Sequence, residues 1–363
     1  MNPARDSAPT LRVLMFPKHG DNPYLRSLAE RLERRGVQVE DFSFRRALGQ
    51  RYDVFHIHWP DLHLHARSTL RTVVKHARLA LMFALLRWRK TRIVWTIHNL
   101  KPHERHRRVG ELLFPIWFPR LCTHVIALTS HGLESARAMY PALRTKTAAV
   151  IPHGHYRDAY GQPLGRTHCR DQLGIGHRFT FVFFGNIRPY KNVPRLIEAF
   201  RALPSRDVQL VIAGQPGHMM NIEELKQLAA GDDRIHLRLQ FVSEDQVPLY
   251  IGASDVVALP FENILNSGSV FLALSFNRAV LAPRLGSLPE IQSHVGARWV
   301  NLYDGPLTTE HLARVLSAGD GGEHETVDLS YYDWDSIGQQ TLDCYLTRTS
   351  RPEPLPSPLP DTP

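Results

Sequence analysis

The chain has 363 residues, 43% of them apolar and 22% charged, a composition that suits two ordinary globular domains and excludes a disordered chain. Its three cysteines are widely spaced and odd in number, which excludes a disulfide framework and indicates a reducing compartment. The net charge of +9 is concentrated, because residues 67–108 hold twelve Lys or Arg against one acid, Glu104. Such a basic patch suits an anionic substrate, an anionic lipid surface or nucleic acid. The first apolar run, Leu11 to Phe16, is too short for a signal or a membrane span, and neither is expected.

In the first half, apolar runs alternate with helical patterns. Leu11 to Phe16 predicts a buried strand, and the loop from Pro17 to Tyr24 leads into an amphipathic helix that Gly36 ends. Strands separated by helices imply parallel βαβ units, so residues 1–160 are predicted to form an N-terminal Rossmann-like domain. The further predicted strands are 37–44, 52–58, 92–97, 124–129 and 147–151.

The second half repeats this pattern. Residues 156–176 are irregular and polar and predict a linker, and residues 170–325 predict a second Rossmann-like domain. A helix within 331–348 is expected to pack back towards the interdomain region, and the proline-rich tail 350–363 is expected to be disordered. The predicted strands are 179–184, 208–213, 236–242, 255–259, 279–282 and 299–303. The predicted fold is α/β, with two Rossmann-like domains facing each other across a ligand-binding cleft.

A basic loop follows the strand predicted at 179–184. The strand stops at Gly185, and two cations three residues apart, Arg188 and Lys191, precede a helix. Glycine lets another molecule approach the backbone, and a helix N-terminus adds partial positive charge. The planar fork of Arg and the point charge of Lys together suit a diphosphate, whereas the alternative is a solvated turn between two core elements.

A polar loop follows the strand predicted at 255–259. Asn266, Ser267, Gly268 and Ser269 precede an apolar helix predicted at 270–276. Hydroxyls and free amides at a helix N-terminus bind anions, although plain helix capping is the alternative. Both loops leave the carboxyl edge of one parallel sheet, so their convergence favours a nucleotide-diphosphate site.

Histidines and carboxylates follow two predicted strands of the first half, at the edge where a general base for an acceptor hydroxyl would stand. Histidines beside a strand can equally be core or rim residues. A zinc site, suggested by two histidines on one face of a strand, lacks a cysteine or a clearly spaced third ligand. The residues concerned are His56, His58, Asp61, His98, His103 and Glu104.

Basic residues recur at helical spacing at Arg67, Arg71, Lys75 and Arg78, and an apolar run follows from Met82 to Trp88. A basic amphipathic helix of this kind suits an anionic membrane surface. The alternative is a helix packed on the sheet with a solvated basic rim. Nucleic acid is not expected as a partner, because the basic excess is confined to one segment and no binding motif is present.

The two-half plan, the junction at 151–154 and the loops at Gly185 and Gly268 resemble the GT-B glycosyltransferases, which in their broad retaining group use nucleotide sugars. The chain is more closely similar to the inverting β-mannosyltransferases of bacterial exopolysaccharide assembly, of the xanthan type. The similarity runs through nearly the whole chain apart from its tails. The segments that carry it are 22–24, 51–54, 56–60, 98–100, 102–104, 153–158, 187–191, 266–268 and 272–275.

The resemblance implies that residues 1–160 form the acceptor-binding domain and residues 170–325 the nucleotide-sugar-binding domain, and it implies roles for individual residues. Arg188 and Lys191 would hold the donor diphosphate, and the remaining donor-site residues would be His153, Gly185, Asn266, Ser267, Gly268 and Ser269. The acceptor side would include Asn22, Tyr24, His58 and His103. The base would be Glu104 before Asp61 or His98. The two glutamates of the retaining group fall on Leu265 and Ala273, which favours an inverting enzyme.

The same resemblance implies a donor, an acceptor and a cellular location. The donor would be GDP-mannose, and the acceptor an anionic oligosaccharide on a polyprenyl diphosphate at the inner face of the cytoplasmic membrane, where the protein would be peripheral. A single displacement without metal or another cofactor would give a β-linkage. The alternatives are a retaining GT-B enzyme with another nucleotide sugar and a non-catalytic protein that binds a nucleotide or an anionic sugar.

Overall fold

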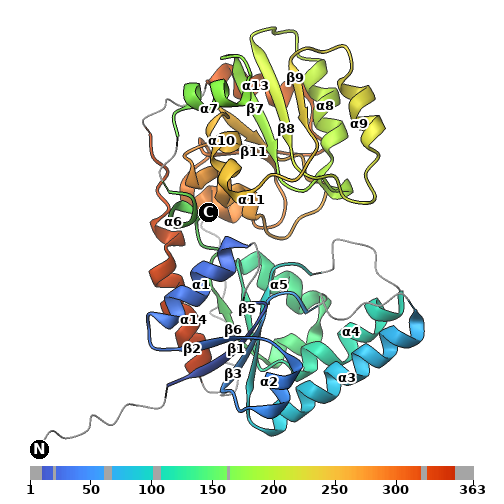
Figure 1. Ribbon diagram of the computed structural model, residues 1–363, viewed down its shortest axis with the longest axis vertical. Helices are drawn as coiled ribbons and strands as arrows, with labels where there is room; N and C mark the ends of the chain where they lie inside the picture. Colours follow the sequence, from blue (N-terminus) through green and yellow to red (C-terminus); the bar gives the residue numbers. More distant parts are fainter. Residues whose placement is uncertain are drawn as a thin grey trace, which may run out of the picture. The chain divides into compact units, whose positions relative to one another are not determined.

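The computed structural model describes residues 10–18, 22–60, 68–100, 108–161, 164–319 and 325–347. Backbone contacts divide the chain into two units. The first runs to Ile151 and takes up the chain again at Gly338, and the second runs from Pro152 to Ile337. Each is an α/β unit on its own parallel six-stranded sheet, drawn with its helices in Figure 1, as the alternation of strand and helix predicted.

The first unit has the strand order β2-β1-β3-β4-β5-β6, and every neighbouring pair is parallel. The chain passes from β1 to β2 on one side of the sheet and from β3 to β4 on the other side, so the switch point lies between the neighbouring strands β1 and β3. The elements are β1 Arg12–Phe16, α1 Pro23–Glu33, β2 Gln38–Asp41, α2 Phe44–Gly49, β3 Val54–Ile57, α3 Thr69–Trp88, β4 Arg92–Ile97, α4 Arg108–Leu121, β5 His124–Ala127, α5 Ser130–Met139, η2 Pro141–Thr145 and β6 Thr147–Val150.

The second unit has the order β12-β11-β10-β7-β8-β9, again parallel throughout, with its switch point between β7 and β10. The elements are α6 Arg157–Tyr160, α7 Arg166–Leu173, β7 Phe179–Phe184, η3 Pro189–Lys191, α8 Val193–Arg201, β8 Val208–Ala213, α9 Ile222–Ala229, β9 Ile235–Arg238, η4 Glu244–Gln246, α10 Val247–Gly252, β10 Val256–Ala258, α11 Gly268–Ser275, β11 Ala279–Pro283, α12 Leu288–Val295, β12 Val300–Tyr303, α13 Thr309–Ala318 and η5 Ser330–Tyr332.

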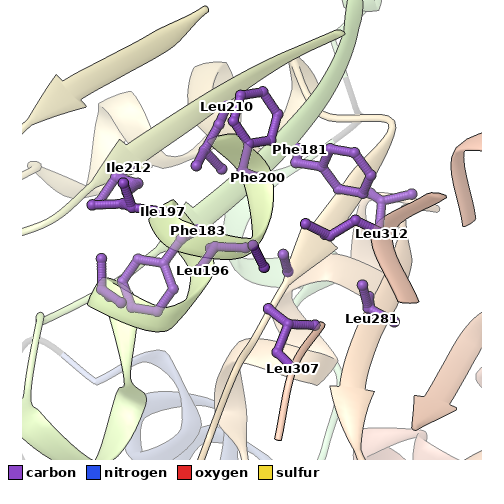
Figure 2. Close-up of a cluster of buried hydrophobic side chains, with 14 of the residues drawn as sticks. Phe181, Phe183, Leu196, Ile197, Phe200, Leu210, Ile212, Leu281, Leu307 and Leu312 are labelled. Atoms are coloured by element: carbon purple, nitrogen blue, oxygen red, sulfur yellow. The ribbon is translucent and has the colours of Figure 1, made fainter. Parts of the chain in front are cut away.

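Strand β7 is fixed by cores on both faces of its sheet. Figure 2 shows Phe181 and Phe183 in a cluster with Leu196, Ile197 and Phe200 of α8. Val182 points to the opposite face and joins a second cluster, made with residues of α7 and α10. Because successive side chains of a strand alternate between faces, the aromatic run at 179–184 fills both cores at once. The position of the loop that follows β7 is therefore set by a strand that is packed on both faces.

The predicted linker at 156–176 is wrong as an irregular segment, since it contains α6 and α7. Two arginines of α7 are buried against one carboxylate: Arg166 Nη1 lies 2.9 Å from Asp255 Oδ1, and Arg170 Nη2 lies 2.6 Å from Asp255 Oδ2. Asp255 Oδ2 also accepts the backbone N–H of Thr180 at 2.6 Å. The polar residues of α7 therefore attach it to the second unit, because a buried charge is tolerated only when it is paired and hydrogen-bonded.

The predicted C-terminal helix is α14, Trp334–Leu346. From Gly338 onward it belongs to the first unit, where the Tyr345 hydroxyl lies 2.6 Å from Nδ1 of His56. The carbonyl of Thr347 lies 3.0 Å from Nε2 of His124. The predicted disorder of 350–363 falls outside the described residues.

Candidate functional site

The loops after β7 and β10 flank the switch point of the second sheet. In parallel sheets of this kind ligands bind outside the carboxyl ends of the strands at such a point. A backbone hydrogen bond of 2.9 Å from Glu262 N to Tyr190 O joins the two loops directly. The convergence predicted from sequence is therefore present in the structure.

Glycine is required at the end of β7. Gly185 has φ +114°, a conformation that side chains with a Cβ rarely adopt. A Cβ at this position would lie 3.3 Å from Lys191 Nζ and 3.9 Å from Ser269 Oγ, so the ammonium and the hydroxyl both stand next to the Gly185 backbone. One cationic group and one hydroxyl, from two segments far apart in the sequence, thus lie beside the main chain at Gly185.

The Lys191 ammonium has cationic surroundings. Its pKa is lowered from 10.5 to about 8, first because burial disfavours the charged form and second because the Arg188 guanidinium repels it. Nζ lies 5.7 Å from the centre of the Phe183 ring, and within the described residues no carboxylate lies at salt-bridge distance from it. An anion bound here would relieve both effects, which is the electrostatic character of an anion site.

Helix α11 supplies the second half of the arrangement. Ser267 is buried at its N-cap position, but its side chain makes no capping hydrogen bond, so the plain-capping alternative does not hold for this residue. The helix starts at Gly268, two residues earlier than predicted, and Ser269 therefore lies in its first turn. Asn266 precedes them, half-buried. The free N–H groups of this first turn add partial positive charge beside Lys191.

His153 lies at the same helix end. Its ring stacks on Phe271 with centroids 4.8 Å apart, and its Nδ1 donates to the Gly154 carbonyl at 2.8 Å. A Cβ on Gly268 would lie 3.8 Å from His153 Nε2 and 3.1 Å from the Tyr156 hydroxyl. Burial lowers the pKa of His153 to about 4, so the ring is neutral at pH 7 and offers hydrogen bonding rather than charge.

A second group of side chains lies at the switch point of the first sheet. Nδ1 of His58, after β3, is 3.1 Å from Nε2 of His98, after β4. Trp59 stacks on His98 with centroids 4.5 Å apart, and the Tyr24 ring packs edge-on against both imidazoles. The pKa of His58 is lowered well below 6.5, chiefly by burial and further by the neighbouring His56 and His98. His58 is therefore neutral at pH 7, and in its hydrogen bond with His98 one ring donates and the other accepts.

His56 has a structural place in this group. Its ring lies 4.2 Å from that of His58, on the same face of β3 as predicted. Its Nε2 is 2.7 Å from Thr96 Oγ1, and Nδ1 contacts Tyr345. The ring is thus held between β4 and α14. Across the described ranges, no three His, Cys, Asp or Glu side chains gather closely enough to hold a metal ion.

Three of the predicted site residues, Asp61, His103 and Glu104, lie outside the described residues. Of the predicted base candidates only His98 is described. Asn22 is described as the N-cap of α1, where its side chain accepts from Tyr24 N at 3.1 Å. The structure thus gives Asn22 a helix-capping contact at the start of α1.

Three residues near the loops after β7 and β10 were not predicted from the sequence: Gly214, Gly217 and Tyr156. Gly214, after β8, has φ +150°, and a Cβ there would lie 2.1 Å from the Gly185 carbonyl oxygen. A Cβ on Gly217 would lie 3.5 Å from Arg188 Cδ. For Gly214 the available signal was a glycine directly after a predicted strand, the same signal that identified Gly185. The hydroxyl of Tyr156 beside Gly268 carried no such signal.

The chain was compared with known proteins. A family model for the group 1 glycosyl transferases matches residues 178–317. A GDP-mannose:glycolipid 4-β-D-mannosyltransferase from Xanthomonas campestris pv. campestris is 34% identical over 344 residues, which cover 94% of this chain and 93% of the relative. Sucrose-phosphate synthase from Thermosynechococcus elongatus has a TM-score of 0.68 at 15% identity, with 93% of this chain and 98% of that chain covered. Anabaena HepE in complex with UDP has a TM-score of 0.64 at 18% identity, with 92% and 98% covered. The two structures show a shared fold.

Proposed function

The chain belongs to the group 1 glycosyltransferases, transferases of the GT-B fold, and we propose that it moves mannose from GDP-mannose to a lipid-linked oligosaccharide with inversion. The observation that carries this proposal is the 34% identity, over nearly the full length of both chains, to a transferase named for GDP-mannose, a glycolipid and a β-linkage. Since the mannose of GDP-mannose is α-linked, a β-product requires inversion at the anomeric carbon.

The donor diphosphate binds at the switch point of the second sheet in this proposal. Lys191 and Arg188 neutralise the phosphates and stabilise the charge that develops on the departing GDP. The first turn of α11, with Gly268 and Ser269, contributes backbone N–H groups and a hydroxyl. Asn266, Ser267 and His153 complete the donor side. No metal ion is part of this proposal.

The acceptor hydroxyl is activated by a base of the first unit. Glu104 is our first choice, and Asp61 and His98 are the alternatives. If His98 is the base, its Nε2–H must donate to Nδ1 of His58, because the partner of one imidazole nitrogen sets the tautomer of the ring and the basic lone pair then lies on Nδ1 of His98. Tyr24 packs on both rings and would hold the pair in place. His103 and Asn22 are proposed to face the acceptor.

The acceptor is proposed to be an anionic oligosaccharide on a polyprenyl diphosphate, in exopolysaccharide synthesis at the inner face of the cytoplasmic membrane. The basic segment supports this proposal, because an acidic sugar and a diphosphate both favour a positively charged surface. In the part of the chain that the structure describes, no helix has the length and apolar character needed to cross a membrane.

Isothermal titration calorimetry with GDP, GDP-mannose, UDP and UDP-glucose tests the donor. GDP and GDP-mannose are expected to bind the wild type, and Lys191→Met is expected to weaken both by at least about tenfold, since a hydrogen bond to a charged group contributes roughly 1.5–3 kcal/mol. Lys226→Met is the matched control, because Lys226 is an exposed lysine paired with Glu223 on α9.

The outcomes separate the possibilities. Binding of UDP species alone would contradict GDP-mannose as donor. Equal weakening by Lys191→Met and Lys226→Met would contradict the proposed phosphate site. An α-linked product in a transfer assay would show a retaining enzyme, the nearest alternative.

A further inference from the structure

His58 has one buried ring nitrogen that no side chain satisfies. Its Nδ1 lies 3.1 Å from Nε2 of His98, but its own Nε2 is buried and has no hydrogen-bond partner among the described residues. A buried polar atom that lacks a hydrogen bond costs free energy, and such atoms are rare in native proteins. His58 follows β3 at the switch point of the first sheet, which is where ligands bind in folds of this kind. The unsatisfied nitrogen therefore points to a ligand.

A sugar hydroxyl matches this nitrogen in either tautomer of the ring. If Nδ1 of His58 accepts from His98, Nε2 carries the hydrogen and donates, whereas if Nδ1 donates, Nε2 accepts. A hydroxyl both donates and accepts, so it satisfies either state. Burial lowers the pKa of His58 well below 6.5, and the neutral ring offers no charge to attract an anion. A hydroxyl of the acceptor is therefore the ligand group that fits His58 best.

The ring of His56 lies directly beside that of His58. The two rings project from the same face of β3, with centroids 4.2 Å apart. His56 is completely buried, in a strand whose other residues, Val54, Phe55 and Ile57, are apolar and buried. An apolar side chain would fill such a position without bringing in a polar group that must be hydrogen-bonded. An imidazole at this position indicates a role beyond packing.

Two buried hydroxyls fix the ring of His56. The Tyr345 hydroxyl of α14 lies 2.6 Å from Nδ1, and Thr96 Oγ1 of β4 lies 2.7 Å from Nε2. Burial raises the pKa of Tyr345 well above 10, so the phenol keeps its hydrogen. Both ring nitrogens are thus hydrogen-bonded, and a buried polar group whose atoms are all satisfied is rigid. Tyr345 therefore holds His56 against His58 and limits the rotation of the His58 ring.

We propose that Tyr345 is a positioning residue of the transferase: through His56 it orients His58, whose Nε2 hydrogen-bonds a hydroxyl of the acceptor. This inference deepens the proposed function and rests on it for the identity of the acceptor. The orientation of the histidines depends on contacts within the first unit alone. The competing role for Tyr345 is to attach α14 to the first unit without any effect on His58.

The variant Tyr345→Phe tests the proposal, because it removes one hydroxyl and keeps the aromatic ring. The kcat/KM for the acceptor is expected to fall by about tenfold or more, since small displacements of a positioned group have effects of this order, while the KM for GDP-mannose stays that of the wild type. Tyr52→Phe is the matched control. The Tyr52 hydroxyl is also hydrogen-bonded, to Glu40 at 3.0 Å and Gln50 at 3.1 Å, but Tyr52 precedes β3 and lies at the opposite edge of the same sheet.

Histidine NMR supplies a measurement that needs no turnover. With isotope-labelled histidine, long-range proton–nitrogen spectra give the tautomer of each ring, and the signals of His58 are assigned by their loss in His58→Gln. The wild type and Tyr52→Phe are expected to show one tautomer of His58. Tyr345→Phe is expected to show a mixture of tautomers, because His56 has lost a hydrogen bond and the ring beside it is free to rotate.

A second pair of variants reaches His56 from its other nitrogen and decides the case if Tyr345→Phe does not fold. Thr96→Val removes the hydroxyl at Nε2 and is expected to cause the same losses, whereas Thr96→Ser keeps a hydroxyl and is expected to restore the wild-type signals of His58.

The outcomes separate positioning from attachment. A lower kcat/KM for the acceptor together with altered His58 signals supports the proposal. Wild-type kinetics in a folded Tyr345→Phe overturn it, and a loss of stability with unchanged His58 signals assigns Tyr345 to the attachment of α14 instead. If the wild type transfers no mannose, the proposed function fails, and the NMR comparison alone then supports or overturns the positioning of His58.

Discussion

Replacing Lys191 with Met removes a buried positive charge while it keeps most of the side chain's length and its position over the Phe183 ring. In the wild type the pKa of Lys191 is lowered from 10.5 to about 8 by burial and by Arg188. At 1.36 kcal/mol per pKa unit this corresponds to at most about 3 kcal/mol of destabilisation by the charged form, and protein relaxation reduces it to roughly 1–2 kcal/mol.

The sign of the pH dependence follows from the direction of this pKa shift. Below pH 8 Lys191 is charged in both the folded and the unfolded state, and the folded state is destabilised by the full amount. Between pH 8 and 10.5 the folded protein has lost this proton while the unfolded chain still binds it, so the destabilisation decreases as the pH rises. Lys191→Met is therefore expected to raise the free energy of unfolding by about 1–2 kcal/mol at pH 7, and this gain shrinks as the pH rises above 8. Turnover should fall by about 100-fold or more, because stabilisation of the leaving group is lost.

Binding of GDP provides a second measure of the same group. A bound diphosphate raises the pKa of Lys191, so binding at pH 8 should take up about 0.5 proton in the wild type, and about 0.1 at pH 7. Calorimetry in two buffers with different heats of ionisation measures this uptake, and urea unfolding measures the stability. A variant that is less stable than the wild type at pH 7, or a wild type that takes up no proton at pH 8, would refute the reasoning.

Four further predictions follow from the same structure. Gly185→Ala should lower stability by about 1–2 kcal/mol and weaken GDP binding. Gly296→Ala is its control and should lower stability alone, because Gly296 also has positive φ but no atom lies within 4 Å of the new Cβ. Equal GDP affinities of the two variants would contradict this prediction. Asp255→Asn should cost about 3–5 kcal/mol in urea unfolding, because it leaves two buried guanidinium groups without a carboxylate, and a loss below about 1 kcal/mol would argue against the buried pair. The pKa of His56 is lowered to about 3 by burial, so its contribution to stability is lost as pH falls below 6.5; unfolding at pH 5 should show a loss of about 2 kcal/mol relative to pH 7, and a flat profile would contradict the buried neutral ring. EDTA is expected to leave mannose transfer unchanged, and a loss of transfer that Mg²⁺ restores would show that a metal ion is needed after all.

The strands were predictable because both faces of a parallel sheet are buried. The apolar runs at 92–97, 179–184 and 208–213 match β4, β7 and β8 residue for residue. The strand predicted at 37–44 was too long, since Ser43 caps α2 with its side chain and ends the extended segment. The apolar pattern from which the strand was predicted does not show where a capping side chain ends it.

The predicted linker failed for a different reason. Arg166 and Arg170 contributed to the polar character of the predicted linker, but both are buried on Asp255. The carboxylate lies more than eighty residues further along the chain, so no local pattern announces the pairing. A polar segment indicates an exposed loop only when its polar side chains are hydrated, and here they are paired with a buried carboxylate instead.

The candidate site was partly predictable. Gly185, Arg188 and Lys191 could be chosen from a strand, a glycine and a cationic spacing, and parallel topology predicted that the Gly268 loop would join them. The contact between Glu262 N and Tyr190 O, and that between His58 and His98, depend on register between distant segments. The helical period places Leu79 and Leu81 on opposite faces of α3, but it could not tell which of the two is buried; Leu79 is, and Leu81 is exposed.

Transfer of mannose is the central claim, and it is measured most directly by incubating the protein with GDP-mannose and a polyprenyl-diphosphate-linked acidic oligosaccharide and assigning the anomeric configuration of the product by NMR. The account predicts a β-mannoside, formed by the wild type and by Lys226→Met but not by Lys191→Met. An α-mannoside would contradict inversion, and transfer only from another nucleotide sugar would contradict GDP-mannose as the donor.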